Sequence, residues 1–214
     1  MRRHAARLAI LLSPLLAGAV ALSACSSSSA ASVPGAPKGI RGVVQSPGAP
    51  KPDFSLADTS GKTFNLPAET AGDVTLLYFG YTHCPDVCPT HMANIAAAMR
   101  QLPDTVTSHI KVVFVTTDPA RDTPTVLRAW LDHFDPAFIG LTGTVDQIHA
   151  AETASGLPNS ATEDLGNGNY AVDHAAQVDA FTTDNLDHVV YPSGYTERDW
   201  VNDLPKLVRG WPGS

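Results

Sequence analysis

Residues 74–102, VTLLYFGYTHCPDVCPTHMANIAAAMRQL, join a buried strand to a helix through a short loop that holds two cysteines. Residues 74–81 form a continuous run of apolar and β-favouring side chains, which is typical of a strand covered on both faces. Further on, apolar residues recur at helical spacing and predict a helix with one buried face: Met92, Ile95, Ala96, Met99 and Leu102. A strand that leads directly into a helix is the unit from which α/β folds are built.

The same alternation of strand and helix continues along the chain. Residues 110–118 predict a second buried strand, and a helix follows with Asp122 or Thr123 as its cap and Pro124 in its first turn. The order fits an α/β, thioredoxin-like fold best, with a central mixed sheet flanked by helices. The remaining expected elements are a strand at 137–141, a helix at 144–155, a polar loop at 156–169, an antiparallel pair at 176–184 and 187–192 that turns near Asn185, and a helix at 196–209.

The N-terminus has the features of an export signal. Three arginines, at positions 2, 3 and 7, precede an apolar run that is too short and too broken by proline and glycine for a membrane span. The run ends in LSAC, with the cysteine at position 25. This order looks like a bacterial lipoprotein signal, with cleavage before Cys25 and fatty acyl chains such as palmitate on that residue. The alternative is an ordinary secretory signal with a chance cysteine.

Three regions follow from this interpretation. Residues 1–24 are the expected signal peptide, and residues 25–52 are the lipid-bearing Cys25 with a flexible tether rich in Ser, Pro, Gly and Ala. Residues 53–214 are the expected folded domain. The expected location is therefore the extracytoplasmic face of the cell membrane, where the lipid holds the domain.

The charge of the chain bears on its partners. The chain has 14 Lys+Arg and 21 Asp+Glu. Removal of the signal takes away three arginines and no acid, so the mature chain carries a net charge of −10. A surface this acidic argues against nucleic acid as a partner.

Cys84 and Cys88 are the thiols that remain once Cys25 carries lipid. Each is followed by a proline, which disfavours a helical conformation in the preceding residue. The pattern predicts Cys88 as the helix N-cap and Pro89 as the first helical residue, where the helix dipole would favour a Cys88 thiolate. The two sulfurs can share one metal ion or form a disulfide. A disulfide across so short a loop would stabilise the fold little, so reactivity explains the pair better.

A metal site would need a further ligand, and histidine is the natural candidate. His91 follows Cys88 by three residues and is a weak candidate, whereas strand alternation turns His83 toward the opposite face. His174 follows a flexible loop, beside Asp173, where a side chain can reach the top of the sheet. Taken alone, His174 is more readily explained as a structural residue than as a metal ligand. Solvated or packed side chains are expected for His109, His133, His149 and His188, and His4 is lost with the signal.

Three segments together resemble the Sco/SenC family of copper proteins: GYTHCPDVCP at 80–89, VFVTTDPARDTP at 113–124 and YAVDHAAQV at 170–178. The resemblance covers residues 52–210 and implies a thioredoxin-like fold. It also implies that Cys84, Cys88 and His174 bind one copper ion per monomer, as Cu(I) or Cu(II). Asp118 matches an acidic position near the family's site and is expected to orient or balance charge there. His91 departs from the small polar residue usual in relatives, so a fourth ligand stays open.

The resemblance implies a metallochaperone, which is not an enzyme. The family delivers copper to the CuA centre of cytochrome c oxidase subunit II, or keeps the cysteines of that centre reduced. An extracytoplasmic copper donor is the other implied partner. A thiol–disulfide oxidoreductase using Cys84 and Cys88 is the main alternative, although the Cys-x-x-Cys and Thr-Pro motifs of thioredoxins are missing. A peroxiredoxin-like peroxidase is a further alternative, but the Pro-x-x-x-Thr-x-x-Cys motif of such enzymes is missing from this sequence. Another is a lipoprotein with a purely structural disulfide, which would give His174 no role.

Overall fold

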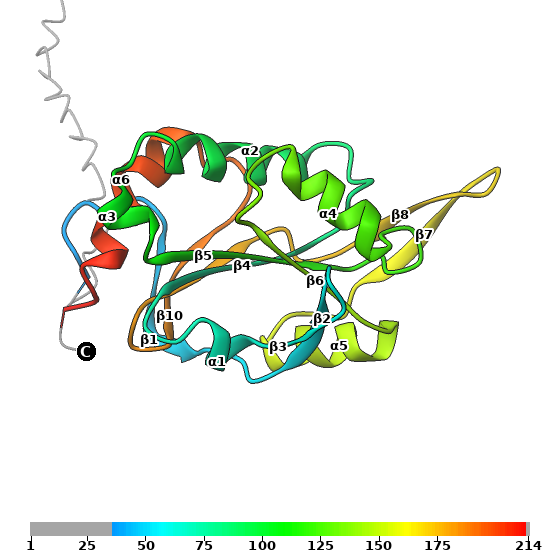
Figure 1. Ribbon diagram of the computed structural model, residues 1–214, viewed down its shortest axis with the longest axis horizontal. Coiled ribbons are helices and arrows are strands. Elements are labelled where there is room, and N and C mark those ends of the chain that lie inside the picture. The colour runs from blue at the N-terminus through cyan, green and yellow to red at the C-terminus, as the bar shows by residue number, and fades with distance from the viewer. Residues whose placement is uncertain (1–35, 213–214) are drawn as a thin grey trace, which may run out of the picture. The chain divides into compact units, whose positions relative to one another are not determined.

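A mixed eight-stranded sheet with helices on both faces organises the chain (Figure 1). The structure is a computed structural model, and it describes residues 36–212. The predicted signal peptide, Cys25 and the first part of the predicted tether lie outside these residues. Within residues 36–212, no helix has both the length and the apolar character that crossing a membrane requires.

The main sheet combines parallel and antiparallel strands. Its strands are β1 (Val43–Pro50), β2 (Ser55–Asp58), β3 (Thr63–Asn65), β4 (Val74–Gly80), β5 (Ile110–Thr116), β6 (Ile139–Thr142), β9 (Val178–Phe181) and β10 (Leu186–Tyr191). They lie in the order β1-β10-β9-β4-β5-β6-β2-β3. β4, β5 and β6 are parallel neighbours, and β9 runs antiparallel to β4. The predicted mixed sheet is therefore confirmed.

The helices cover this sheet in two layers. They are α1 (Leu66–Glu69), α2 (Val87–Met99), α3 (Asp104–Thr107), α4 (Pro124–Asp132), α5 (Val145–Ala154) and α6 (Glu197–Val208). α2, α3, α4 and α6 lie on one face of the sheet, and α1 and α5 lie on the other (Figure 1). The predicted helices at 144–155 and 196–209 correspond to α5 and α6.

β4 lies at the centre of the core and is buried along its whole length, as the apolar run predicts. Side chains alternate between the two faces of a strand. Tyr78 accordingly packs in the cluster that contains Met92 of α2, while Leu77 packs in the cluster that contains Leu66. Each layer of helices therefore has its own apolar core on one side of the sheet.

The predicted tether at 25–52 extends too far, because residues 43–50 form β1 at the edge of the sheet. Val43 pairs with Val190 and Pro50 with Leu186 of β10. The folded domain thus begins before residue 53. Backbone pairing holds this segment, so its low content of core-forming side chains was a misleading signal.

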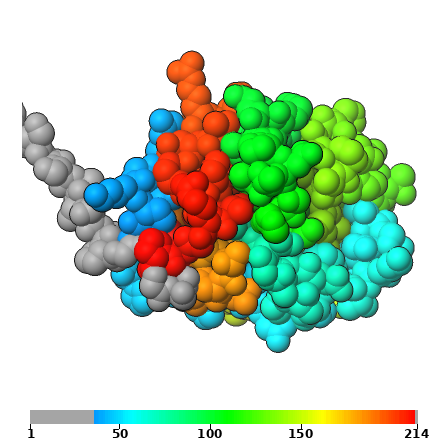
Figure 2. Space-filling model, turned by 60° about the vertical axis from the view of Figure 1, so that its left-hand side comes forward, coloured from blue at the N-terminus to red at the C-terminus, as the bar shows by residue number. Residues whose placement is uncertain are grey.

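The segment just before β1 is bound to α6. The backbone N–H groups of Arg41 and Gly42 donate to the carboxylate of Asp203, which is fully buried. The hydroxyl of Tyr191 donates to the same carboxylate at 2.9 Å. Figure 2 shows the blue N-terminal segment lying against the red C-terminal helix. A buried carboxylate thus fixes the entry of the chain into the sheet.

The predicted polar loop at 156–169 is also corrected. Residues 161–166 form β7 (Ala161–Gly166), which pairs with β8 (Asn169–Asp173) in a separate two-stranded hairpin. Figure 1 shows this yellow hairpin extending away from the main sheet. Every residue of β7 is exposed, so no alternation of apolar and polar side chains marked it as a strand.

Candidate metal centre

Cys84, Cys88 and His174 come together from three different parts of the fold. Cys84 lies in the loop after β4, Cys88 in the first turn of α2 and His174 directly after β8. One ligand atom from each of the three lies within 4.8 Å of the other two. The Sγ atom of Cys88 is 3.6 Å from Nε2 of His174. The site stands at the carboxyl end of a parallel strand, where ligands gather in α/β sheets.

The start of α2 differs from the prediction. The helix begins at Val87, so Cys88 is its second residue and Asp86 takes the N-cap position. Proline is tolerated anywhere in a first turn, because the N–H groups there have no partner within the helix. Asp86 makes no side-chain capping bond. Instead, the N–H of Cys88 donates to the Sγ atom of Cys84 at 3.4 Å.

Cys84 is the thiolate of the pair. The pKa of its thiol is lowered to about 5, chiefly by a hydrogen bond from the Cys88 thiol and further by the N–H groups of Cys88 and Asp86. The helix N-terminus therefore favours the anion at Cys84, not at Cys88 as the sequence suggested. At neutral pH Cys84 can act directly as a nucleophile or metal ligand.

Cys88 keeps its proton. Its pKa is raised, first because its thiol donates to Cys84 and second because the side chain is buried. The hydroxyl of Tyr78 donates to the same sulfur at 3.3 Å. Cys84 and Cys88 are not joined by a disulfide in the structure. A metal ion entering between the sulfurs would release this remaining proton.

His174 directs one ring nitrogen at the cysteines. Its Nδ1 atom lies 3.0 Å from the carbonyl oxygen of Ala175. A carbonyl only accepts, so Nδ1 carries the proton and Nε2 keeps a free lone pair toward Cys88. The rings of Tyr78 and Tyr81 pack edge-on against the imidazole. Two thiols and an aligned imidazole are soft donors of the kind that bind Cu(I) or zinc.

The other two nearby histidines lie outside this group. His91 is buried and its Nε2–H donates to the carbonyl oxygen of Ala176 at 3.1 Å. Burial lowers the pKa of the His91 ring, which keeps it neutral. His91 therefore supports the segment that carries His174. His83 is half exposed, with its ring 3.7 Å from Asp122, in agreement with the expected turn away from the cysteines.

Asp118 contacts none of the three candidate ligands. Its carboxylate pairs with Arg121 and accepts a hydrogen bond from the hydroxyl of Tyr170 at 2.9 Å. The guanidinium of Arg121 lies over the ring of Tyr81, which in turn packs against His174. Arg121 and Tyr81 thus connect Asp118 to the candidate ligand His174.

Asp122 is a supporting residue that the sequence did not reveal. It is fully buried and accepts hydrogen bonds from the backbone N–H of Thr82 and from the hydroxyls of Thr82 and Thr116. Thr123, not Asp122, caps α4. An acidic residue just before a Thr-Pro helix start suggests a cap equally well, so local pattern could not separate the two roles.

Comparison with known proteins shows the family to which this chain belongs. The SCO1/SenC family model matches residues 44–209, which is most of the chain. The chain belongs to the SCO1/SenC family. Protein SCO2 of Saccharomyces cerevisiae mitochondria is 41% identical over 125 residues, covering 57% of this chain and 40% of the relative. The chain thus spans well under half of that SCO1/SenC relative.

Solved structures agree with this assignment. The copper-bound structure of ScoI from Bradyrhizobium japonicum is 30% identical, with a TM-score of 0.66 and coverage of 74% of this chain and 99% of that one. A thioredoxin-family thiol:disulfide interchange protein from Chlorobium tepidum is 13% identical, with a TM-score of 0.53, covering 77% of this chain and 99% of its own. The second likeness concerns the fold alone. This SCO1/SenC protein thus has the predicted thioredoxin-like fold.

Proposed function

We propose that this protein is an extracytoplasmic copper metallochaperone, with Cys84, Cys88 and His174 as the ligands of its copper cargo. The observation that carries the proposal is the convergence of two sulfurs and one imidazole nitrogen within 4.8 Å. This donor set suits Cu(I), and the imidazole also admits Cu(II). The copper-bound ScoI relative supports copper as the metal.

Transfer to a partner requires a site that a competing ligand can enter. Cys84 is only partly buried, whereas Cys88 is covered. A thiolate or imidazole of the partner can therefore approach beside Cys84 and replace the ligands one at a time. We propose the CuA centre of cytochrome c oxidase subunit II as the recipient and an extracytoplasmic copper donor as the source. The family resemblance supports both roles.

We further propose that lipid on Cys25 holds the protein on the extracytoplasmic face of the cell membrane. The support is the LSAC sequence after a basic and then apolar N-terminus. Two acyl chains on one residue give stable membrane attachment where a single chain does not. A recipient embedded in the same membrane would then be within reach.

A second candidate function is reduction of the CuA cysteines by the dithiol. The low pKa of Cys84, about 5, favours it, because the thiolate is the attacking species in thiol–disulfide exchange. The N–H of Cys88 donates a hydrogen bond to the Sγ atom of Cys84, so Cys88 lies close enough to resolve the mixed disulfide. The same two residues serve both functions, so only the role of His174 separates them.

The deciding experiment is a Cu(I) and Cu(II) titration of the reduced chain against a competing chelator. The variants are Cys84→Ser, Cys88→Ser and His174→Ala, with His133→Ala as the matched control on the C-terminal end of α4. We expect one copper ion per chain in the wild type and in the control. Each site variant should lose at least tenfold in affinity, because each removes one of three ligands.

The outcome for His174→Ala separates the two functions. Wild-type copper affinity in that variant would contradict the metallochaperone proposal and leave dithiol reduction as the better account. Loss of copper affinity with retained reduction of a disulfide substrate would assign His174 to metal transfer.

A further inference from the structure

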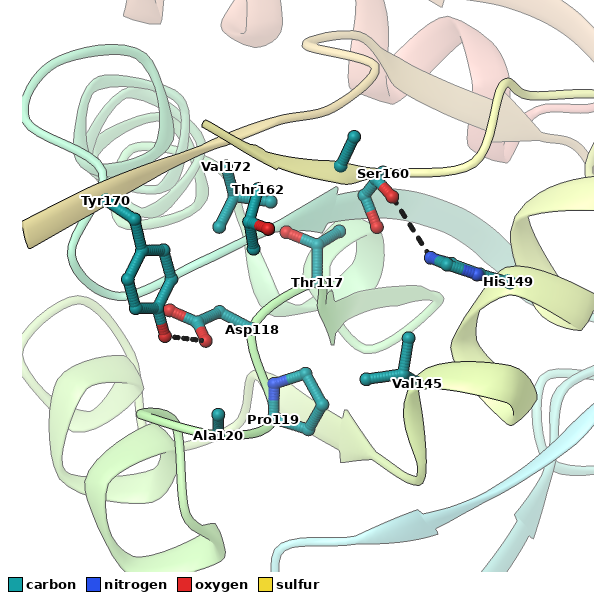
Figure 3. Close-up of a pocket in the computed structure, with 11 residues that line it drawn as sticks. Thr117, Asp118, Pro119, Ala120, Val145, His149, Ser160, Thr162, Tyr170 and Val172 are labelled. Atoms are coloured by element: carbon teal, nitrogen blue, oxygen red, sulfur yellow. Dashed lines mark hydrogen bonds between the residues drawn. The ribbon is translucent and has the colours of Figure 1, made fainter. Parts of the chain in front are cut away.

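A cavity lies beside the candidate metal centre, beneath the β7–β8 hairpin (Figure 3). Its volume is about 490 Å³, which is within the range of ligand sites. Three segments line it: the turn after β5, the first turns of α5 and the inner face of the hairpin. None of the three candidate copper ligands lines it, so the cavity is distinct from the metal centre.

One hydroxyl in the wall of this cavity has no partner. The Oγ1 atom of Thr117 is buried and makes no hydrogen bond. Figure 3 shows the Thr117 hydroxyl directed toward the side of the cavity where Thr162 lies. A buried hydroxyl without a partner is costly, and a ligand that hydrogen-bonds to it would remove the cost.

The carboxylate of Asp118, in contrast, is already engaged. It pairs with Arg121 and accepts the hydroxyl of Tyr170, a bond that Figure 3 draws. Apolar groups form much of the remaining wall: Pro119, Ala120, Val145 and Val172. The cavity therefore has a largely apolar wall, with the hydroxyl groups of Thr117 and Thr162 also lining it.

The surroundings of the cavity are acidic. Between residues 129 and 197 the sequence contains no lysine or arginine. Over the same stretch, Asp146 at the start of α5 and Glu163, Asp164 and Asp173 on the hairpin are all exposed. Arg121, whose guanidinium lies over the ring of the lining residue Tyr170, is paired with Asp118. The remaining charges of this region, those of the four acidic residues, therefore favour a cationic group at the cavity.

We propose that this cavity binds a lysine side chain from a basic segment of the protein with which this chain exchanges copper. The methylene stem would lie along the apolar wall and the ammonium would donate to the hydroxyls of Thr117 and Thr162. Lysine fits better than arginine, because a guanidinium seeks a carboxylate with both oxygens available, and Asp118 is occupied. This inference rests on the proposed function, which supplies the partner.

The position of the cavity suits such a partner. Tyr170 lines the cavity, and the guanidinium of Arg121 lies 3.6 Å from the centre of its ring. Arg121 also lies over Tyr81, which packs against His174. β8, which forms one wall, ends at the residue before His174. A segment bound here would therefore hold its protein next to the copper ligands.

The test is a nuclear magnetic resonance titration of the full-length, reduced chain with two short peptides. The first is Ac-Ser-Val-Lys-Val-Ser-NH2, and the second replaces its lysine with norleucine, which keeps the stem and removes the charge. We expect the lysine peptide to shift the backbone amide signals of Thr117, Val145 and Val172. The norleucine peptide should bind at least tenfold more weakly.

Three variants make the test specific. Thr117→Val keeps the shape of the side chain and should weaken lysine-peptide binding about tenfold, and Thr162→Val on the exposed hairpin should weaken it without threatening the fold. Thr105→Val, at an exposed position on α3, is the matched control and should bind as the wild type does.

The proposal is overturned if millimolar lysine peptide leaves the cavity signals unmoved, if norleucine binds equally well, or if neither Thr117→Val nor Thr162→Val weakens binding. The titration uses no copper, so its result does not depend on the metal. Failure of the copper function would instead appear in the chelator competition.

Discussion

Asp122 ties the loop of the candidate ligand Cys84 to the end of β5. Its carboxylate accepts two hydrogen bonds from Thr82 and one from Thr116. Asp122 and Thr116 are fully buried, and Thr82 is partly buried. A single side chain therefore sets the path of the chain two residues before Cys84.

Replacement of Asp122 by alanine should destabilise the fold and the loop that carries the candidate ligand Cys84. We expect the free energy of unfolding to fall by about 2–4 kcal/mol, because a backbone N–H and two hydroxyls lose their buried acceptor. Urea unfolding followed by circular dichroism measures this. The control is Asp132→Ala, a half-exposed residue that pairs with Arg128 in the same helix. Equal stability of the two variants would contradict the assigned role.

Asp187 carries a buried carboxyl on the opposite part of the sheet. It accepts hydrogen bonds from the Gln45 side chain and the Val189 N–H. Burial, together with the neighbouring Asp179, raises the pKa of Asp187 from 3.8 to about 8. Asp187 therefore stays protonated in the folded chain at neutral pH.

This shift predicts a pH dependence of stability. Between pH 4 and 8 the unfolded chain has lost the Asp187 proton that the folded chain retains. The free energy of unfolding should therefore fall as the pH rises, by up to ~1.4 kcal/mol per pH unit. Asp187→Asn should flatten this slope in urea unfolding measured from pH 5 to 8, whereas Asp146→Asn, at an exposed position, should not. Parallel profiles for Asp187→Asn and wild type would refute the prediction.

At the scale of elements, β4 and β5 were predictable because each carries its own burial signal. Their apolar runs are long, and both faces of each strand are covered. β1 and β7 carry no such signal. β1 is held by pairing with β10 and by the contacts of Arg41 and Gly42 with Asp203, and β7 by pairing with β8. Both strands are held by pairing with other strands, which their own sequences do not reveal.

The candidate metal centre likewise has features that could be predicted from the sequence and features that could not. The spacing of Cys84 and Cys88 was visible because a loop and a helix start are local features. His174 could be chosen among the histidines only through the family resemblance, since 86 residues separate it from Cys88. Which cysteine is the thiolate could not be predicted from the sequence. It depends on which sulfur accepts the hydrogen bond from the Cys88 N–H, and only the three-dimensional structure shows that this is the sulfur of Cys84.

Removal of residues 1–45 should destabilise the domain, since this cut takes away the first three residues of β1. Asp203 would lose the N–H groups of Arg41 and Gly42, and Asp187 would lose Gln45. We expect a loss of about 3–5 kcal/mol in the free energy of unfolding, because a buried charged group is left with fewer donors. The control is a chain that begins at residue 36. Equal unfolding midpoints in urea would show that β1 is dispensable.

For the whole molecule, the proposed lipid on Cys25 decides where the domain works. Cys25→Ser should move the protein from the membrane fraction to the soluble extracytoplasmic fraction, because the attachment site for lipid is lost. Immunoblotting of separated fractions measures this, with Cys84→Ser as the control that keeps Cys25. Retention of Cys25→Ser in the membrane would contradict lipid attachment at this residue.

The register of β1 has a mechanical consequence. Val43 lies opposite Val190, Tyr191 lies opposite Val178, and Val178 lies opposite Tyr78, six residues before Cys84. Three strand spacings, roughly 14 Å, therefore separate the start of β1 from this level of β4. Tension on the N-terminal segment would act on the end of the domain that carries the cysteines. If lipid on Cys25 attaches this segment to the membrane, as we propose, the end of the domain with the candidate copper ligands stays nearer the attachment point than the rest of the domain does.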